Sequence, residues 1–209
     1  MLFSAVDYRC DAEGAHVILK NQILFKKSII MAEMDVLLGC KVTNFDMPGR
    51  AEALRLALAI GGVDFEDERL AFAEWPASKP TWPFQALPAL TLGNGEIITQ
   101  WRTILRFLGP KFGIYPSDAL LAMRCDELMD AVDDLIVKTN STGQGLPVEE
   151  KLAKRIEAAA EGGSIAKHMG CLEAYIEKYG SGGYAIGSSI TVADLVLFNA
   201  VGMATSGFF

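Results

Sequence analysis

The chain has 209 residues, a formal net charge of −7 at pH 7 and a hydrophobic content of 51%. This length suits one compact unit or two small domains, with enough apolar material for a substantial core. The acidic balance argues against nucleic acid as a principal partner, although an acidic surface can still surround a basic pocket. No apolar run reaches the roughly 18 residues of a membrane-spanning helix. The longest candidate, from Ser28 into Cys40, is interrupted by Glu33 and Asp35.

The cysteines are widely spaced and form no pair with the spacing of a metal or redox motif: Cys10, Cys40, Cys125 and Cys171. The chain also has only two histidines, so we expect neither a zinc-like cluster nor any other metal. The cysteines could form two disulfides, but free buried thiols in a reducing cytosol are favoured. We therefore predict a cytoplasmic protein.

Residues 1–34 differ from the rest of the chain, because they show no clear helical or strand period. They also lack the order of charged, apolar and small residues that marks a secretory signal. Asp7, Asp11 and Glu13 argue against an organelle transit peptide. We treat this segment as an N-terminal extension of unknown status, with Met31 or Met34 as alternative natural starts.

From Leu37 onward, the pattern of apolar residues predicts a small α/β domain over residues 36–113. The expected elements are a strand at 38–45, a helix at 50–60, strands at 63–70, 87–92 and 96–99, and a helix at 101–108. The Asn94-Gly95 pair between the last two strands is a strong hairpin signal. We expect Gly109-Pro110 to end the second helix.

After Pro116 the pattern contains helices only, and we expect an all-helical domain over residues 117–209. One helix is predicted at 121–135, and a long one from 148 to about 179, with an interruption at Gly162-Gly163 as the alternative.

Thr191, followed by Asp194, is close to a capping box and predicts another helix start. The apolar tail after it ends at Phe209. An apolar helix rarely stops at a bare terminus, so we expect a truncated C-terminus.

Five segments, in this order, resemble the cytosolic glutathione transferases, most closely the sigma class with its prostaglandin-isomerase members. They are Asn44 to Glu52, Glu74-Trp75-Pro76 with Lys79, Leu87 to Leu90, Gln100 to Leu108, and Ser189 to Leu195. Each segment alone is a weak signal, but their order is specific, and the resemblance covers roughly residues 36–209. It implies a thioredoxin-like N-terminal domain followed by an all-α helical bundle.

The resemblance also implies a function. Such a protein binds glutathione as a co-substrate and conjugates it to small electrophiles, or uses it in an isomerisation. The family further implies a homodimer in the cytoplasm with a role in detoxification. The resemblance places the glutathione contacts at Phe45, Trp75, Lys79, Leu87, Pro88, Gln100, Trp101 and Asp126.

Several of these roles have simple chemistry. Lys79 can pair with the glycine carboxylate of glutathione, and Trp75 can donate its indole N–H to the same group. The alternative is a solvated lysine beside a partly buried tryptophan. The backbone of Leu87, before a family cis-proline at Pro88, can pair with the cysteinyl backbone of the ligand. The resemblance implies that Asp126 reaches a ligand across a dimer interface; alternatively, it is one more acid on an acidic helix face.

The thiol-activating tyrosine of the family is replaced here by Asn44. A thiol with a pKa of about 8.5 is mostly protonated at pH 7, so catalysis requires a group that favours the thiolate. The asparagine amide can donate a hydrogen bond to sulfur. Thr43 should point to the opposite face of the strand. Arg50 can supply positive charge near the sulfur, or it can be a structural ion pair at a helix start.

A second departure is Trp101, where the family has a serine that caps a helix and contacts the γ-glutamyl carboxylate. Tryptophan cannot cap, and its bulk would crowd an anion at the helix start. Gln100 stays usable, and Thr99 can cap from one position earlier.

These departures leave three hypotheses open. The leading one is a glutathione-dependent enzyme with atypical thiol activation by Asn44 and Arg50. The second is a catalytically silent relative that serves as a ligand-binding or structural protein. The third is a scaffold that pairs through its helical domain with another transferase-like chain. The second-substrate pocket is expected at Met47, Pro48 and the helix after Pro116.

Overall fold

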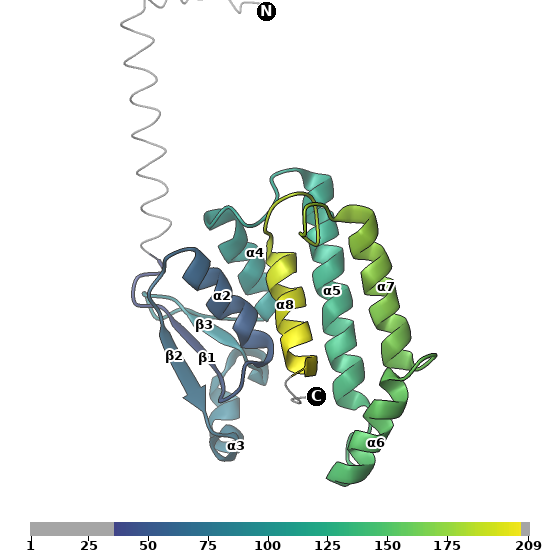
Figure 1. Cartoon of the computed structure of the whole chain (residues 1–209). Helices are drawn as coiled ribbons and strands as arrows, with labels where there is room; N and C mark the ends of the chain where they lie inside the picture. Colours follow the sequence, from purple (N-terminus) through teal and green to yellow (C-terminus); the bar gives the residue numbers. More distant parts are fainter. Residues whose placement is uncertain (1–35, 206–209) are drawn as a thin grey trace, which may run out of the picture.

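The computed structural model describes residues 36–205 (Figure 1). The expected N-terminal extension and the expected truncation at Phe209 both lie outside these described residues. Within them, no helix combines the length and apolar character needed to cross a membrane. The three described cysteines are free thiols: Cys40 and Cys125 are buried, as predicted, whereas Cys171 is exposed.

A four-stranded mixed sheet forms the first part of the structure (Figure 1). Strand β1 (Lys41–Phe45) pairs in parallel with β2 (Glu66–Leu70) and antiparallel with β3 (Ala89–Thr91). Strand β4 (Ile97–Thr99) pairs antiparallel with β3, which gives the order β2-β1-β3-β4. The predicted hairpin is therefore confirmed. Its turn places Gly95 at a φ of 87°, a backbone conformation that favours glycine.

Strand β2 begins later than the sequence pattern predicts. The expected strand starts at Val63, but the N–H of Val63 donates to the carbonyl of Leu58 and so completes the end of the preceding helix. Pairing with β1 starts only at Glu66. The apolar pattern at these positions therefore reflects helix capping and core packing as well as sheet formation.

Two helices connect strands, and a third follows the last strand. Helix α2 (Glu52–Ile60) follows a short 3-10 turn at Gly49–Ala51, and α3 (Trp75–Ser78) lies within a run of 3-10 turns after β2. Helix α4 (Trp101–Lys111) extends past Pro110, so the prediction that Gly109-Pro110 ends it was wrong. Pro110 lacks an N–H and so removes its own hydrogen bond from α4. The helical hydrogen bonding continues after it, since the N–H of Phe112 donates to the carbonyl of Leu108.

The second part of the structure is helical (Figure 1). It contains α5 (Ala119–Ser141), α6 (Val148–Ala159), α7 (Ser164–Tyr179) and α8 (Val192–Thr205). The prediction of one long helix from 148 to about 179 was wrong. The alternative is confirmed: an interruption at Gly162-Gly163 separates α6 from α7, and Gly162 has a φ of 78°. Helix α5 is longer than predicted at both ends. Its first turn is capped by the Asp118 side chain, which accepts from the Leu121 N–H at 2.9 Å.

The capping motif predicted at the start of α8 is present in altered form. The Asp194 carboxylate accepts the backbone N–H of Thr191 at 2.7 Å, as a capping-box acid does. It also accepts the Thr191 hydroxyl at 2.9 Å and the Ala185 N–H at 2.7 Å. One carboxylate thus joins the helix start to the preceding loop.

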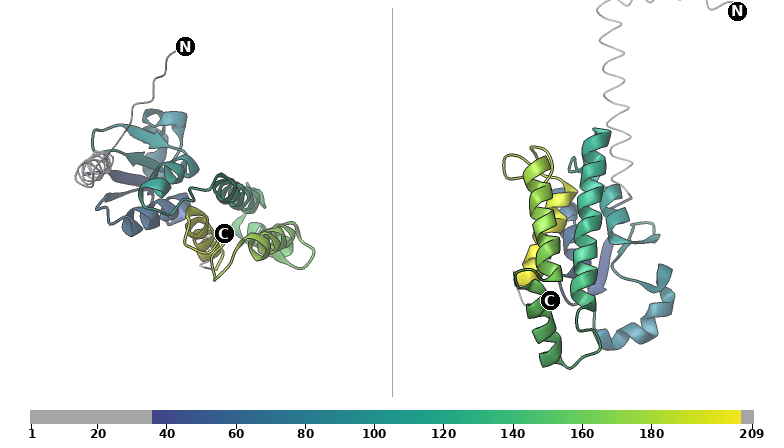
Figure 2. Two further views of the ribbon diagram at one scale, coloured as in Figure 1. Left: turned by 90° about the horizontal axis from the view of Figure 1, so that it is seen from above. Right: turned by 90° about the vertical axis from the view of Figure 1, so that its right-hand side faces the viewer.

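Helix α8 joins the two parts of the molecule. It packs against α2 and α4 on one side and against α5 on the other, and the two views of Figure 2 show it within this group. A continuous apolar core runs from β1 and α2 through α4 to α5 and α8. The fold is therefore a thioredoxin-like domain followed by a helical domain, which confirms the predicted fold class.

Candidate functional site

A cavity of about 310 Å³ opens where β1 ends, and Asn44 lies in its wall. The Asn44 side chain is only 4% exposed. The neighbouring Thr43 faces the other side of the strand, where its hydroxyl donates to Glu68 at 2.7 Å. The two parts of the fold share the lining of this cavity: Asn44, Phe45, Met47, Gly49, Arg50, Phe72, Leu87, Pro88, Ile136, Asn140 and Met203.

Arg50 forms an ion pair, which is one of the two roles that the sequence left open. It lines the cavity, and its Nε donates to an Asp133 carboxylate oxygen on α5 at 2.7 Å. Asp133 is also paired with Arg102 at 3.2 Å. The ion pair therefore anchors Arg50 to the helical domain while its positive charge stays at the cavity. Its role near a bound sulfur stays a prediction.

Aromatic rings form one end of this site. The Phe45 ring stacks on Phe72 with 4.6 Å between centroids, and Trp75 meets the Phe45 ring edge-on at 5.3 Å. Trp75 is half-buried and Lys79, one turn further along the chain, is exposed. The Leu87-Pro88 bond is cis, as the resemblance implies. Trp75 thus lies against Phe45, which lines the cavity, and the clamp formed by Trp75 and Lys79 stays a prediction.

The start of α4 has no side-chain cap. Gln100 precedes the helix with a φ of 71°, and the buried Thr99 hydroxyl has no hydrogen-bond partner. The prediction that Thr99 caps this helix was therefore wrong. Trp101 is 5% exposed and packs into the apolar core. Its expected crowding of an anion at the helix start stays a prediction.

Asp126 lies in a network between α4 and α5. Its carboxylate accepts from Arg106 Nε at 2.8 Å and from the Tyr115 hydroxyl at 2.9 Å. Burial, reinforced by the hydrogen bond to this carboxylate, raises the pKa of Tyr115 to about 12. Asp126 is therefore fixed within its own chain, and the contact with a partner's ligand stays a prediction.

The structure brings together some of the predicted residues and leaves others apart. Those that line the cavity are Asn44, Phe45, Arg50, Leu87 and Pro88. Trp75 does not line it but contacts Phe45, which does. Lys79, Gln100, Trp101 and Asp126 do not line it.

Sequence reasoning missed three residues from the helical domain: Ile136, Asn140 and Met203. The only signal for the first two was their spacing of four, which places them on one face of α5.

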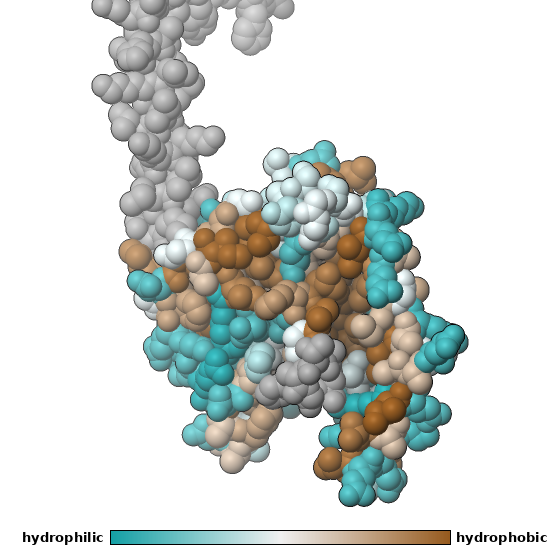
Figure 3. Space-filling view, viewed as in Figure 1, coloured by the Kyte–Doolittle hydropathy of each residue, from teal (hydrophilic) through white to brown (hydrophobic). Residues whose placement is uncertain are grey.

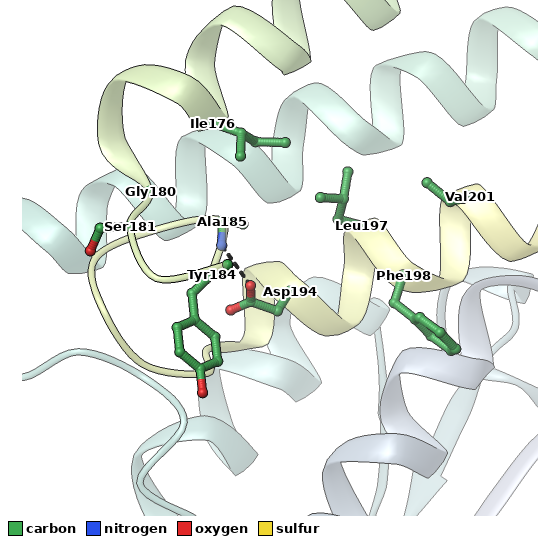
Figure 4. Close-up of a pocket in the computed structure, with 10 residues that line it drawn as sticks. Ile176, Gly180, Ser181, Tyr184, Ala185, Asp194, Leu197, Phe198 and Val201 are labelled. Carbon is green, nitrogen blue, oxygen red and sulfur yellow. Dashed lines mark hydrogen bonds between the residues drawn. The ribbon is translucent and has the colours of Figure 1, made fainter.

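A larger cavity of about 560 Å³ lies between α7 and α8, and Figure 4 shows its lining. It contains none of the predicted site residues. Its acid, Asp194, is bonded to Ala185 and Thr191 and offers no free charge. Phe198 on α8 is 67% exposed. Figure 3 shows apolar side chains gathered on the face that carries α2 and α8. The polar side chains of the larger cavity lie among apolar residues, and none of them is a predicted site residue: Ser181, Tyr184 and Asp194.

The residues described do not include a group of three or more His, Cys, Asp or Glu side chains placed to hold a metal ion. The chemistry available at the cavity comes from the amides of Asn44 and Asn140, the guanidinium of Arg50 and an apolar wall.

Comparison with known families agrees with this geometry. Residues 40–109 match the glutathione S-transferase N-terminal domain, and residues 146–208 match a glutathione S-transferase C-terminal domain. The chain belongs to the glutathione transferase family. Glutathione S-transferase 1 of Ascaris suum is 34% identical over 166 residues, which cover 77% of this chain and 78% of that protein.

Two further relatives agree with the sigma-like character of this transferase. The hematopoietic prostaglandin D synthase of Gallus gallus is 35% identical over 111 residues, covering 53% of this chain and 55% of that protein. The solved sigma-class transferase of Fasciola hepatica is 26% identical, with a TM-score of 0.69 and coverage of 80% of both chains. The family resemblance is confirmed, and the relatives include a prostaglandin D synthase and a sigma-class transferase.

Proposed function

We propose that this transferase binds glutathione in the 310 Å³ cavity and that the Asn44 amide stabilises its thiolate for attack on small electrophiles. The observation that carries the proposal is a nearly buried amide, at the end of the central strand, in the wall of a ligand-sized cavity. Its Nδ2 can donate to sulfur, and a hydrogen bond to the charged form lowers a thiol pKa. Arg50 adds positive charge on the same wall.

The start of α4 supports binding of the γ-glutamyl end. A helix N-terminus carries free N–H groups and partial positive charge, so it attracts a carboxylate. No side chain caps this terminus, and the Thr99 hydroxyl beside it is buried without a partner. A bound carboxylate would supply acceptors both for the N–H groups at the start of α4 and for the Thr99 hydroxyl.

The other side of the cavity supports an apolar second substrate. Met47, Ile136 and Met203 contribute apolar side chains from three separate segments. Flexible methionines adapt to irregular apolar ligands. We propose conjugation of glutathione to small apolar electrophiles as the activity.

The second candidate is a silent glutathione-binding relative, and a specific observation favours it. Asn44 replaces the phenol that activates the thiol in the family. Arg50, the other activating candidate, is already paired with Asp133. Under this alternative the cavity still binds glutathione but leaves its thiol pKa unchanged.

Binding itself is tested at the exposed Lys79. Lys79→Met should raise the Kd for glutathione about two- to fivefold, because exposed ion pairs contribute about 0.2–1 kcal/mol. The loss of affinity should be smaller at high salt, because salt screens the ion pair between Lys79 and the glycine carboxylate. Isothermal titration calorimetry at two salt concentrations measures both effects.

The matched control is Lys167→Met, at an exposed lysine on α7. Its Kd should equal that of the wild type. A wild type that does not bind glutathione contradicts the proposed function, and equal effects of the two substitutions contradict the role of Lys79.

A further inference from the structure

One buried hydrogen bond joins α8 to the loop that carries the candidate thiol site. The Asn199 side chain is 4% exposed, and its Nδ2 donates to the backbone carbonyl of Gly49 at 2.8 Å. The two residues are 150 positions apart in the sequence. The same carbonyl also accepts the backbone N–H of Glu52 within the local turn, so the Asn199 bond is the contact that ties this turn to α8.

Gly49 in turn lies against Asn44. A Cβ atom built on Gly49 would lie 3.1 Å from Asn44 Nδ2, and Gly49 has a φ of 50°, in the region that favours glycine. Both residues line the same cavity. A displacement of Gly49 therefore changes the space around the amide that faces the cavity.

The helical domain holds this loop at two points. Asp133 on α5 fixes the Arg50 side chain, and Asn199 on α8 fixes the Gly49 backbone. Only the second contact constrains the peptide that adjoins Asn44. Asn199 is not among the residues that line the cavity, so it does not touch a ligand there.

We propose that Asn199 is a positioning residue of the thiol site. Its amide holds the Gly49 carbonyl and thereby sets the geometry between Asn44 and a bound sulfur. The inference rests on the proposed function, because it requires Asn44 to act on the glutathione thiol. Hydrogen bonds weaken steeply with misalignment, so a small loop displacement is enough to reduce thiolate stabilisation.

The test is Asn199→Leu, which keeps the branched side-chain shape and removes the donor. Asn199→Ala is the second variant, because it removes the same donor without placing an apolar group against the carbonyl. The control is His168→Leu, since His168 Nε2 donates to the Ala131 carbonyl between α7 and α5, also at 2.8 Å. That bond lies entirely within the helical domain.

Three quantities are measured for each protein: the Kd for glutathione, the pKa of the bound thiol from ultraviolet absorbance of the thiolate, and the urea midpoint. Both Asn199 variants should lower the thiolate fraction of bound glutathione at pH 7 about three- to tenfold, with a matching rise in the thiol pKa. His168→Leu should lower the urea midpoint and leave the thiol pKa at the wild-type value.

A wild-type thiol pKa in both Asn199 variants overturns the inference and leaves the proposed function intact. Equal thiol pKa changes in the Asn199 and His168 variants also overturn it, because they reduce Asn199 to a general stabilising residue. A wild type that binds glutathione without lowering its thiol pKa overturns the proposed thiol activation, and the inference with it.

Discussion

Asn44→Ala is expected to raise the pKa of the bound glutathione thiol by about one to two pH units, because a neutral donor to a charged acceptor contributes about 1.5–3 kcal/mol. Because less of the bound glutathione is then thiolate, the rate of conjugation at pH 7 should fall about 10- to 100-fold. The Kd for glutathione should change little, since the carboxylate contacts lie elsewhere in the ligand. Ultraviolet titration of bound glutathione and a conjugation assay with a chlorinated nitroarene measure these effects.

Asn140→Ala is the matched control. Asn140 carries the same amide and lines the same cavity, but it comes from α5. We expect it to leave the thiol pKa unchanged. Equal changes in the thiol pKa for Asn44→Ala and Asn140→Ala would show that Asn44 does not act specifically on the sulfur.

Asn44→Tyr separates the enzyme from the silent alternative. If the wild type binds glutathione without turnover and Asn44→Tyr restores turnover, the chain is a silenced transferase. If the wild type turns over and Asn44→Ala does not, the asparagine supports catalysis.

Asp194→Asn should lower the free energy of unfolding by about 2–4 kcal/mol, because hydrogen bonds to charged groups contribute about 1.5–3 kcal/mol each. The carboxylate accepts from the Thr191 N–H, the Thr191 hydroxyl and the Ala185 N–H. An amide of the same shape turns one acceptor oxygen into a donor, which then faces another donor. Urea unfolding measures the change.

The control for this prediction is Asp118→Asn at the start of α5. Asp118 is exposed and accepts a single N–H, from Leu121. Asparagine and aspartate cap helices about equally well, so its effect should be small. A small effect at both positions would show that Asp194 is an ordinary helix cap that does not hold the loop before α8.

Local signals predicted most of the fold. The Asn94-Gly95 turn, the break at Gly162-Gly163 and the acid at Asp194 each act within a few residues, so the sequence alone determines them. Element ends depended on contacts further away. Val63 completes α2 instead of joining the sheet, and Pro110 is accommodated within α4.

The candidate site was predicted where its residues follow one another along the first domain. Asn44, Phe45, Leu87 and Pro88 meet because β1 and the start of β3 are neighbours in the sheet. The wall from Ile136, Asn140 and Met203 depends on how α5 and α8 pack, which no local pattern records. The hydrogen-bond network around Asp126 could not be predicted either, because Arg106 and Tyr115 come from other segments of the chain.

A crystal structure with glutathione bound tests the central claim most directly. We expect the sulfur within hydrogen-bonding distance of Asn44 Nδ2, the glycine end toward Trp75 and Lys79, and the γ-glutamyl carboxylate at the start of α4. A sulfur that lies away from Asn44, or glutathione in the larger cavity between α7 and α8, would contradict the account.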